Sequence, residues 1–147
     1  MAKKKIKFRE VEIPGSELKI ILGRDKESND ELMKKYKGKK NIILHTSAPG
    51  SPFGVMEKLN PTKEEIYISG SIVASYSQDW RNNKKDIVID VFTGKDISKP
   101  FWLKAGTWKV KKSNKIKIKK QDIIKFGRKN ANEKNRNTSN RKTRDNR

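Results

Sequence analysis

The chain has 147 residues, of which 37 are lysine or arginine and 17 are aspartate or glutamate, so its formal net charge is +20. Hydrophobic residues make up 32% of it and charged residues 37%, which is enough for one domain with a modest core and leaves segments that add nothing to that core. The sequence has no cysteine, which excludes a disulfide framework, and no long apolar run, so no membrane contact is expected; the positive charge favours a polyanionic partner.

The N-terminal part predicts a basic arm followed by a hairpin. Residues 1–7 are expected to be flexible, and they lack the apolar segment of a secretory signal. Because the chain has no cysteine, a reducing cytoplasm is the expected location. Apolar residues in 8–13 and 18–22 have a loose strand-like spacing on either side of Pro14-Gly15, and this pattern predicts a β-hairpin.

The stretch from residue 23 to residue 52 predicts a short helix and a strand. Ser28 and Glu31 have the spacing of a capping box, which predicts that a helix begins at Ser28. The apolar residues 42–44 predict a strand, which delivers His45 to a turn that contains Ser51.

Residues 53–59 predict another strand, and one long helix follows. Pro61 suits the first helical turn, and Thr62 with Glu65 repeats the capping-box spacing. Tyr76 and Trp80 continue an apolar stripe at helical spacing, so we expect both rings in the core rather than stacked on bases. Small residues along this helix predict close packing against a sheet.

The C-terminal half predicts a central strand and a second hairpin. Residues 87–92 are almost continuously apolar, as in a central strand. Residues 107–112 and 115–120 alternate with period two around Ser113-Asn114, which predicts a hairpin with one apolar face and one lysine face. The predicted fold class is therefore α+β: residues 8–127 form a single mixed β-sheet with two helices packed on it, and residues 128–147 form a disordered basic tail.

Basic residues on the predicted hairpin are the first candidates for a binding surface. Like charges on one face repel each other unless a polyanion lies against them, although some of these lysines can serve only to protect a sheet edge from aggregation. Lysine-rich surfaces hold phosphates, so we expect the shape of the target to matter more than its sequence. The candidates are Lys109, Lys111, Lys115, Lys117 and Lys119, extended by Arg24, Lys26, Lys99 and Lys104.

Catalytic alternatives have weaker support in the sequence. His45 is the one histidine, so a zinc site or a relay to a nucleophilic Ser51 lacks the partners that such chemistry needs, and no cofactor is expected. Asp86, Asp90 and Asp96 are the acidic residues near a strand that could hold Mg²⁺ in a nuclease. A general DNA-binding protein that acts through charge alone is the other alternative.

A series of short motifs carries a family resemblance. Gly23-Arg24-Asp25, Asn29-Asp30, Leu44-His45-Thr46, Pro49-Gly50-Ser51-Pro52, Ser98-Lys99-Pro100 and Lys104-Ala105-Gly106-Thr107-Trp108 occur in this order. Over roughly residues 18–120 the chain resembles the RNA-binding domain of the NFACT family, which ends the large fibronectin-binding-like proteins of ribosome quality control.

The resemblance implies a function and a set of residues. It implies non-catalytic binding of structured RNA, either tRNA or large-subunit rRNA, in ribosome-associated quality control. The residues that match are Arg24, Asn29, Asp30, His45, Ser51, Lys99 and Gly106. Two roles stay open for His45: it either bonds a phosphate or ribose, or ties the turn at Pro49 to its strand.

Two departures from the family pattern limit what can be transferred. The family usually has tryptophan before Leu-His, and this chain has Ile43. The large members also carry an N-terminal domain, a helix-hairpin-helix module and a coiled coil, none of which fits within these 147 residues. We therefore expect an accessory RNA-binding protein with the large ribosomal subunit as partner, or one that assembles with a separate chain carrying the other domains.

Overall fold

The computed structural model describes residues 7–13 and 15–127. Most of the predicted arm, residues 1–6, and the predicted tail, residues 128–147, lie outside the described residues. The strands are β1 (Arg9–Glu12), β2 (Lys19–Leu22), β3 (Ile42–Thr46), β4 (Gly54–Met56), β5 (Ile87–Thr93), β6 (Ile97–Ser98), β7 (Lys109–Val110) and β8 (Asn114–Ile118). The helices are α1 (Lys26–Tyr36), α2 (Lys63–Ser75), α3 (Gln78–Asn83) and α4 (Lys120–Phe126), with a 3₁₀ turn, η1, at Gly94–Asp96.

One antiparallel sheet organises the chain. Its strands follow the order β1-β2-β4-β3-β5-β8, and β6 pairs with β7 in a separate two-stranded sheet. The α+β fold class and the hairpin of residues 8–22 are confirmed, since β1 and β2 pair antiparallel. The details differ from expectation, because each pairing among the described strands is antiparallel rather than mixed, and there are four helices rather than two.

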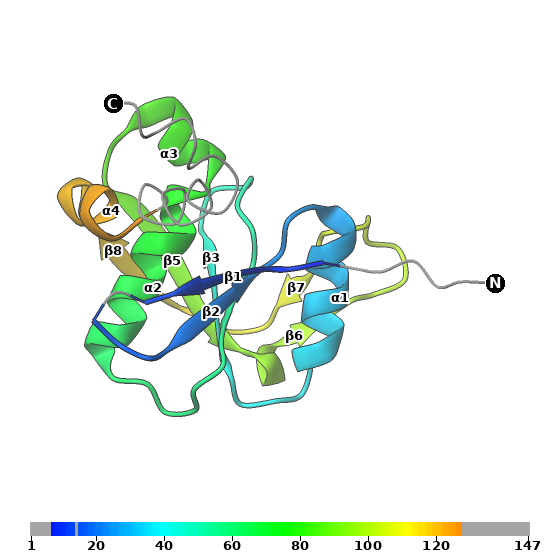
Figure 1. Ribbon diagram of the computed structural model, residues 1–147. Coiled ribbons are helices and arrows are strands. Elements are labelled where there is room, and N and C mark those ends of the chain that lie inside the picture. The colour runs from blue at the N-terminus through cyan, green and yellow to red at the C-terminus, as the bar shows by residue number, and fades with distance from the viewer. Residues whose placement is uncertain (1–6, 14, 128–147) are drawn as a thin grey trace, which may run out of the picture.

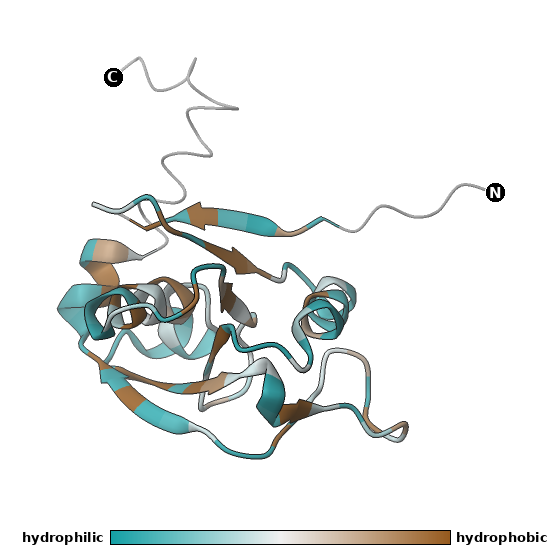
Figure 2. Cartoon of the chain, turned by 90° about the horizontal axis from the view of Figure 1, so that it is seen from below, coloured by the Kyte–Doolittle hydropathy of each residue, from teal (hydrophilic) through white to brown (hydrophobic). Residues whose placement is uncertain are grey.

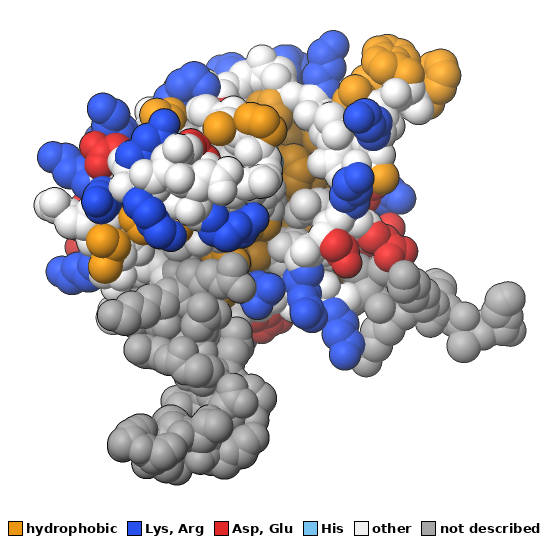
Figure 3. Space-filling model, turned by 90° about the horizontal axis from the view of Figure 1, so that it is seen from above, with side chains coloured by type: hydrophobic (Ala, Val, Ile, Leu, Met, Phe, Trp, Pro, Cys, Tyr) orange, Lys and Arg blue, Asp and Glu red, His pale blue; other side chains and the backbone are white. Residues whose placement is uncertain are grey.

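The six-stranded sheet lies between two covering layers (Figures 1 and 2). Helices α2 and α4 cover one face, whereas α1 and the β6–β7 pair cover part of the other. Basic side chains are scattered over the surface seen in Figure 3 and outnumber the acidic ones there. No helix within the described part of the chain has the length and apolar character needed to cross a membrane.

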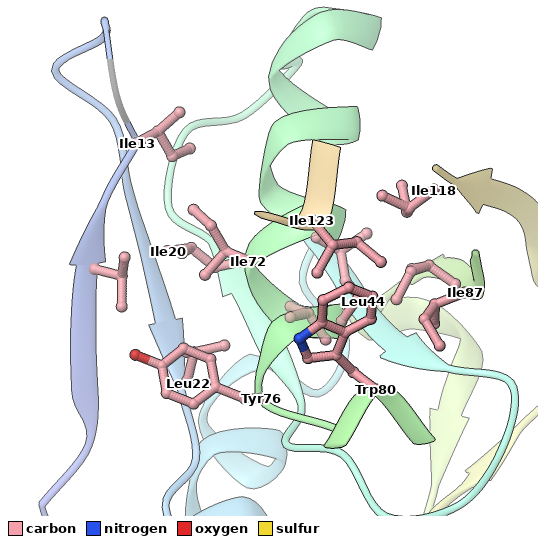
Figure 4. Close-up of a cluster of buried hydrophobic side chains, with 14 of the residues drawn as sticks. Ile13, Ile20, Leu22, Leu44, Ile72, Tyr76, Trp80, Ile87, Ile118 and Ile123 are labelled. Carbon is pink, nitrogen blue, oxygen red and sulfur yellow. The ribbon is translucent and has the colours of Figure 1, made fainter. Parts of the chain in front are cut away.

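The larger core lies between α2 and the sheet. Ile20, Leu44 and Ile118 contribute from three strands and are fully buried (Figure 4). Tyr76 and Trp80 are buried in the same cluster, as the apolar stripe predicted. Gly70 allows α2 to approach the sheet closely, because a Cβ there would lie 3.1 Å from Cδ1 of Ile118.

The sequence predicted one of the two longer helix caps correctly and the other wrongly. Thr62 and Glu65 form the predicted capping box of α2. The prediction for α1 was wrong, because the cap lies three residues before Ser28, at Asp25, whose carboxylate accepts a hydrogen bond from the backbone N–H of Ser28. Ser28 is therefore the third residue of the helix and not its cap, and its hydroxyl accepts in turn from the Asp25 backbone.

The predicted long helix is interrupted. Helix α2 ends at Ser75, and Ser77 becomes the N-cap of α3 by accepting a hydrogen bond from the Trp80 backbone at 3.0 Å. The hydroxyls of Ser75 and Ser77 also donate to backbone carbonyls of α2, and this competes with continuation of the helix. The apolar stripe continues across the break, so the period alone did not reveal it.

The predicted hairpin of residues 107–120 was wrong. Its first half, β7, pairs with β6, and its second half, β8, pairs with β5 in the main sheet. This arrangement buries Ile118 under α2 on one face of the sheet and Trp108 beside α1 on the other. The prediction also continued the strand to Lys120, whereas that residue opens α4.

Candidate nucleic-acid interface

The N-terminus of α1 and the turn after β3 are held together by hydrogen bonds. Asn29 accepts a hydrogen bond from the Phe53 backbone N–H through Oδ1 at 3.2 Å, and the Gly23 N–H donates to the Phe53 carbonyl at 3.1 Å. The backbone of Arg24 donates to the Ser28 hydroxyl at 2.6 Å. These contacts fix the segment that carries Arg24 and Lys26 beside the turn of residues 47–52.

Ser51 is a structural residue of that turn. Its hydroxyl accepts from the backbone N–H of Thr46 at 3.1 Å and donates to the carbonyl of Pro52 at 3.1 Å. The Thr46 hydroxyl in turn donates to the Ala48 carbonyl at 2.6 Å. Ser51 therefore shapes the site, and its side-chain hydrogen-bonding capacity is largely used by the turn.

A hollow of about 300 Å³ lies where four elements of the chain meet. We call it the arginine hollow, defined by Arg9 of β1, Arg24 before α1, Lys26 in α1 and Arg81 in α3. The guanidinium of Arg9 lies 4.9 Å from the ring centroid of Tyr76. Among the described residues, the side chains of Arg24, Lys26 and Arg81 form no hydrogen bond or ion pair.

Arg9 and Arg81 were missed by the sequence analysis. They are 72 positions apart in the chain, on a strand and on a short helix that the sequence did not separate from α2. No local spacing links them to Arg24, because the sheet and the α2–α3 break bring them together. Their convergence follows from tertiary structure alone.

A second depression, of about 510 Å³, adjoins the arginine hollow. We call it the central groove; it is lined on one side by His45, Phe92 and Asp90 of the sheet and on the other by Gly106 and Trp108 of the segment before β7. The two depressions share Lys26, Gly50 and Ser51, so they form one continuous surface. The predicted residues Arg24, Lys26, His45 and Ser51 are thus brought together.

His45 contacts its own strand. Its Nδ1 lies 2.7 Å from the carbonyl oxygen of Thr46, and its ring centroid lies 4.6 Å from that of Phe53. Burial lowers the pKa of His45, and this effect exceeds the opposing influence of the Thr46 hydrogen bond and of nearby Asp90. The imidazole is therefore neutral at pH 7, and with the proton on Nδ1 it donates to Thr46. A hydrogen bond with the Ser51 backbone also acts on the His45 ring, so His45 contacts the turn that the hydroxyls of Thr46 and Ser51 close.

Lys99 fastens a loop to α1. Its ammonium donates to the Asp30 carboxylate at 3.1 Å and to the carbonyls of Lys104 and Thr107 at 2.6 and 2.8 Å. The same Asp30 oxygen, Oδ1, accepts from the Gly106 backbone and from Nε1 of Trp108, both at 2.9 Å. The three donor positions of Lys99 are thus used within the protein, which gives it a structural role.

The electrostatics of Asp30 agree with this role. Burial by itself would raise the pKa of Asp30, but the hydrogen bonds from Trp108, Gly106 and Lys99 and the charge of Lys99 outweigh it, so the pKa lies below its ordinary value. Gly106 has a φ of +82°, lines the central groove and packs against Lys26, which lines both depressions.

The predicted lysine face is divided between separate places. Lys109 lies on β7, and Lys111 follows it and donates its backbone N–H to the Asp96 carbonyl at 2.7 Å. Lys115 and Lys117 lie on β8, opposite Asp90 and Val88 in the register of the sheet. Strand alternation therefore places these two lysines on the same face of the sheet as His45, and Lys115 pairs with Asp90 of the central groove. Lys104 and Lys119 are exposed at the loop and at the start of α4.

The three aspartates of the nuclease alternative have separate partners. Asp90 pairs with Lys115 at 2.6 Å, Asp86 accepts from the Lys120 backbone at 2.8 Å, and Asp96 accepts from the Thr93 backbone at 3.0 Å. Residues 7–13 and 15–127 contain no group of three or more histidine, cysteine, aspartate or glutamate side chains able to hold a metal ion.

No curated protein sequence matches the chain. A solved structure of the C-terminal part of the fibronectin/fibrinogen-binding protein from Streptococcus suis is similar in fold, with a TM-score of 0.72 at 19% identity, over 84% of this chain and 50% of that chain. This chain therefore spans about half the length of that structure. The model of the NFACT protein RNA binding domain matches residues 7–126, and the chain belongs to this family of RNA-binding domains.

Proposed function

We propose that the protein binds structured RNA, either tRNA or large-subunit rRNA, without catalysis, and that the arginine hollow holds the RNA backbone. The observation that carries the proposal is the convergence of Arg9, Arg24, Lys26 and Arg81 on one hollow. Membership in a family of RNA-binding domains supplies the class of polyanion.

The composition of the hollow favours phosphate as its ligand. Arginine presents a planar fork of donors that matches phosphate oxygens in pairs, and lysine adds a point charge. Within the described part of the chain, Arg24, Lys26 and Arg81 have no anionic partner, so their mutual repulsion is relieved when a phosphate enters. Asp25 also lines the hollow, but its carboxylate caps α1.

The central groove extends the phosphate site on the same surface. Lys115 pairs with Asp90 of the groove, and Lys117 follows on the same face of the sheet, so an RNA backbone that follows the surface meets basic side chains on both sides of Gly50 and Ser51. Such contacts position a nucleic acid without reading its bases, and the A-form shape of structured RNA then sets the preference.

The cellular role that we propose comes from the family. In this proposal the protein acts in ribosome-associated quality control in the cytoplasm, with the large ribosomal subunit as its site of action. In this proposal the protein acts there as an accessory RNA-binding protein, or assembles with a separate chain that carries other domains of the NFACT family.

The test is equilibrium binding of the full chain to tRNA, a large-subunit rRNA fragment and duplex DNA over a series of salt concentrations. The double variant Arg24→Ala with Arg81→Ala removes two charges from the hollow, and Lys37→Ala with Lys63→Ala removes two from exposed positions outside it. We expect the first variant to bind tRNA at least about tenfold more weakly than the second and to have a log–log salt slope smaller in magnitude by about 1.5. Equal binding by the two variants, or duplex DNA bound as tightly as tRNA, would overturn the proposal.

A further inference from the structure

The loop between β6 and β7 ends in two exposed aromatic side chains. Phe101 is 94% exposed and Trp102 is 68% exposed, whereas the other tryptophans, Trp80 and Trp108, are buried at 8% and 9%. The rings of Phe101 and Trp102 contact each other edge to face, with centroids 5.4 Å apart and planes at 81°. In the space-filling view, hydrophobic side chains project from the end of the molecule where Figure 1 places this loop (Figure 3).

The base of this loop is closed by hydrogen bonds. Lys99 donates to the carbonyls of Lys104 and Thr107, and Leu103 donates its backbone N–H to the carbonyl of Pro100 at 3.0 Å. Asp30 then fixes the closed loop to α1 through Lys99. The aromatic pair thus stands on an ordered base, and it belongs to neither of the two core clusters.

We propose that Phe101 and Trp102 stack on unpaired bases of an RNA whose backbone lies in the arginine hollow; this inference rests on the proposed function. The segment that follows the pair connects the two places, because Ala105, Gly106 and Thr107 line the central groove and a Cβ at Gly106 would lie 3.1 Å from Lys26. An RNA strand bound along this path reaches from the arginine hollow to Phe101 and Trp102, which we call the aromatic tip.

Size and charge favour a nucleic acid over a protein at the tip. A stable protein interface buries about 800 Å² on each partner around an apolar centre, which is more than two isolated rings supply. Rings interleaved with basic residues are the arrangement that binds single-stranded nucleic acid, where aromatic faces take bases of any identity. The exposed Lys104 lies two positions after Trp102 and supplies such a basic residue next to the rings.

The inference predicts a specific preference. The protein should bind an RNA hairpin with an unpaired loop more tightly than a blunt RNA duplex of equal phosphate count. Loss of one stacked base costs roughly 5- to 150-fold in affinity, so removal of both rings should bring the hairpin close to the duplex.

The test measures both RNAs against the full chain and three double variants at one salt concentration. Phe101→Ala with Trp102→Ala removes the tip, Leu59→Ala with Ile124→Ala removes two exposed apolar side chains elsewhere, and Arg24→Ala with Arg81→Ala weakens the hollow. Because Trp102 is the one exposed tryptophan in the sequence, its fluorescence reports directly on stacking. We expect the hairpin to quench it and the duplex to leave it almost unchanged, with Trp102→Phe as the spectroscopic blank.

The outcomes separate the two proposals. Hairpin affinity lost in the tip variant, with duplex affinity kept, supports stacking. If the tip variant binds both RNAs like the wild type while the hollow variant loses both, the stacking inference fails and the proposed function stands. If the wild type binds neither RNA at low salt, the proposed function and the stacking inference both fail. If the tip variant loses only self-association or binding to a protein, the tip is a protein-docking element and the stacking inference is overturned.

Discussion

The ammonium of Lys99 lies 3.1 Å from the carboxylate of Asp30, although the two residues are 69 positions apart in the chain. With the hydrogen bonds from Gly106 and Trp108 to the same oxygen, this contact attaches the segment between β6 and β7 to α1. One carboxylate on the helix thereby sets the position of the loop that lines the central groove and carries the aromatic tip.

Asp30→Asn should destabilise the protein. The substitution removes the charge that orients three donors, and the side chains of Asp30 and Lys99 are only 18% and 22% exposed, so we expect a loss of about 2–3 kcal/mol in the free energy of unfolding. Urea unfolding measures this loss. Glu31→Gln is the matched control, because its exposed pair with Lys34 should contribute within about 0.5 kcal/mol, and equal stability of the two variants would contradict the role of Asp30.

The contribution of Asp30 should disappear in acid. Its pKa in the folded protein is lowered below the ordinary value of 3.8, so the unfolded chain binds the proton more readily. The stabilisation is therefore present in full above the unfolded pKa and is lost as the pH falls through the folded one. The difference in unfolding free energy between the wild type and Asp30→Asn should be constant from pH 7 to pH 5.5 and shrink below pH 4. A difference that grew in acid would have the wrong sign.

His45 should titrate below its ordinary pKa of 6.5, because burial disfavours the charged imidazolium. It is the one histidine, so a single set of ring resonances in NMR gives the value directly. Since the folded pKa is depressed, the unfolded state gains the proton first, and stability should decline as the pH falls through 6.5. RNA affinity should be equal at pH 7 and pH 8, and a marked drop over that range would indicate that a charged His45 contacts the RNA.

Local signals in the sequence predicted much of the fold. The capping box at Thr62, the hairpin around Pro14-Gly15 and the burial of Trp80 each depend on residues close together in the chain, and each is confirmed. The error at Ser28 has the same local character. Asp25 and Ser28 have the same capping spacing as Ser28 and Glu31. The helix starts at the earlier pair because β2 ends at Leu22 and Gly23 bonds to Phe53, which puts Asp25 in position to cap the helix.

The candidate site was less predictable because it depends on long-range pairing. The alternation around Ser113-Asn114 is equally compatible with a hairpin and with two strands that join different sheets. The two strands join different sheets because their apolar side chains are covered by different helices: α2 covers Ile118 of β8, and α1 covers Trp108 before β7. Arg81 lies at the arginine hollow on α3, which begins after its N-cap Ser77, whereas α2 ends at Ser75. The apolar period runs through this break and therefore does not predict it.

Asp90→Asn should strengthen RNA binding. Asp90 is the acidic side chain that lines the central groove, and it holds Lys115 in an ion pair at 2.6 Å, so its neutralisation removes a repulsive charge and releases a lysine. We expect about a two- to fivefold gain in affinity at low salt. Glu64→Gln makes the same change of charge on exposed α2 and should have a smaller effect. A nuclease would behave differently, since loss of Asp90 would abolish cleavage of labelled RNA in Mg²⁺.

A chain that ends at Gly127 should lose affinity but keep its preference. Residues 128–147 contain eight basic and two acidic residues, and such charge attracts any nucleic acid. The arginine hollow and the central groove are formed by residues between Arg9 and Val110, and Gly127 still donates to the carbonyl of Ile123 to complete α4. Truncation should therefore weaken tRNA and duplex DNA binding by the same factor, which competition titrations at matched salt measure as an unchanged ratio. A ratio of one for the truncated chain would mean that its folded surface binds tRNA and duplex DNA equally. The selection for RNA would then lie in residues 128–147.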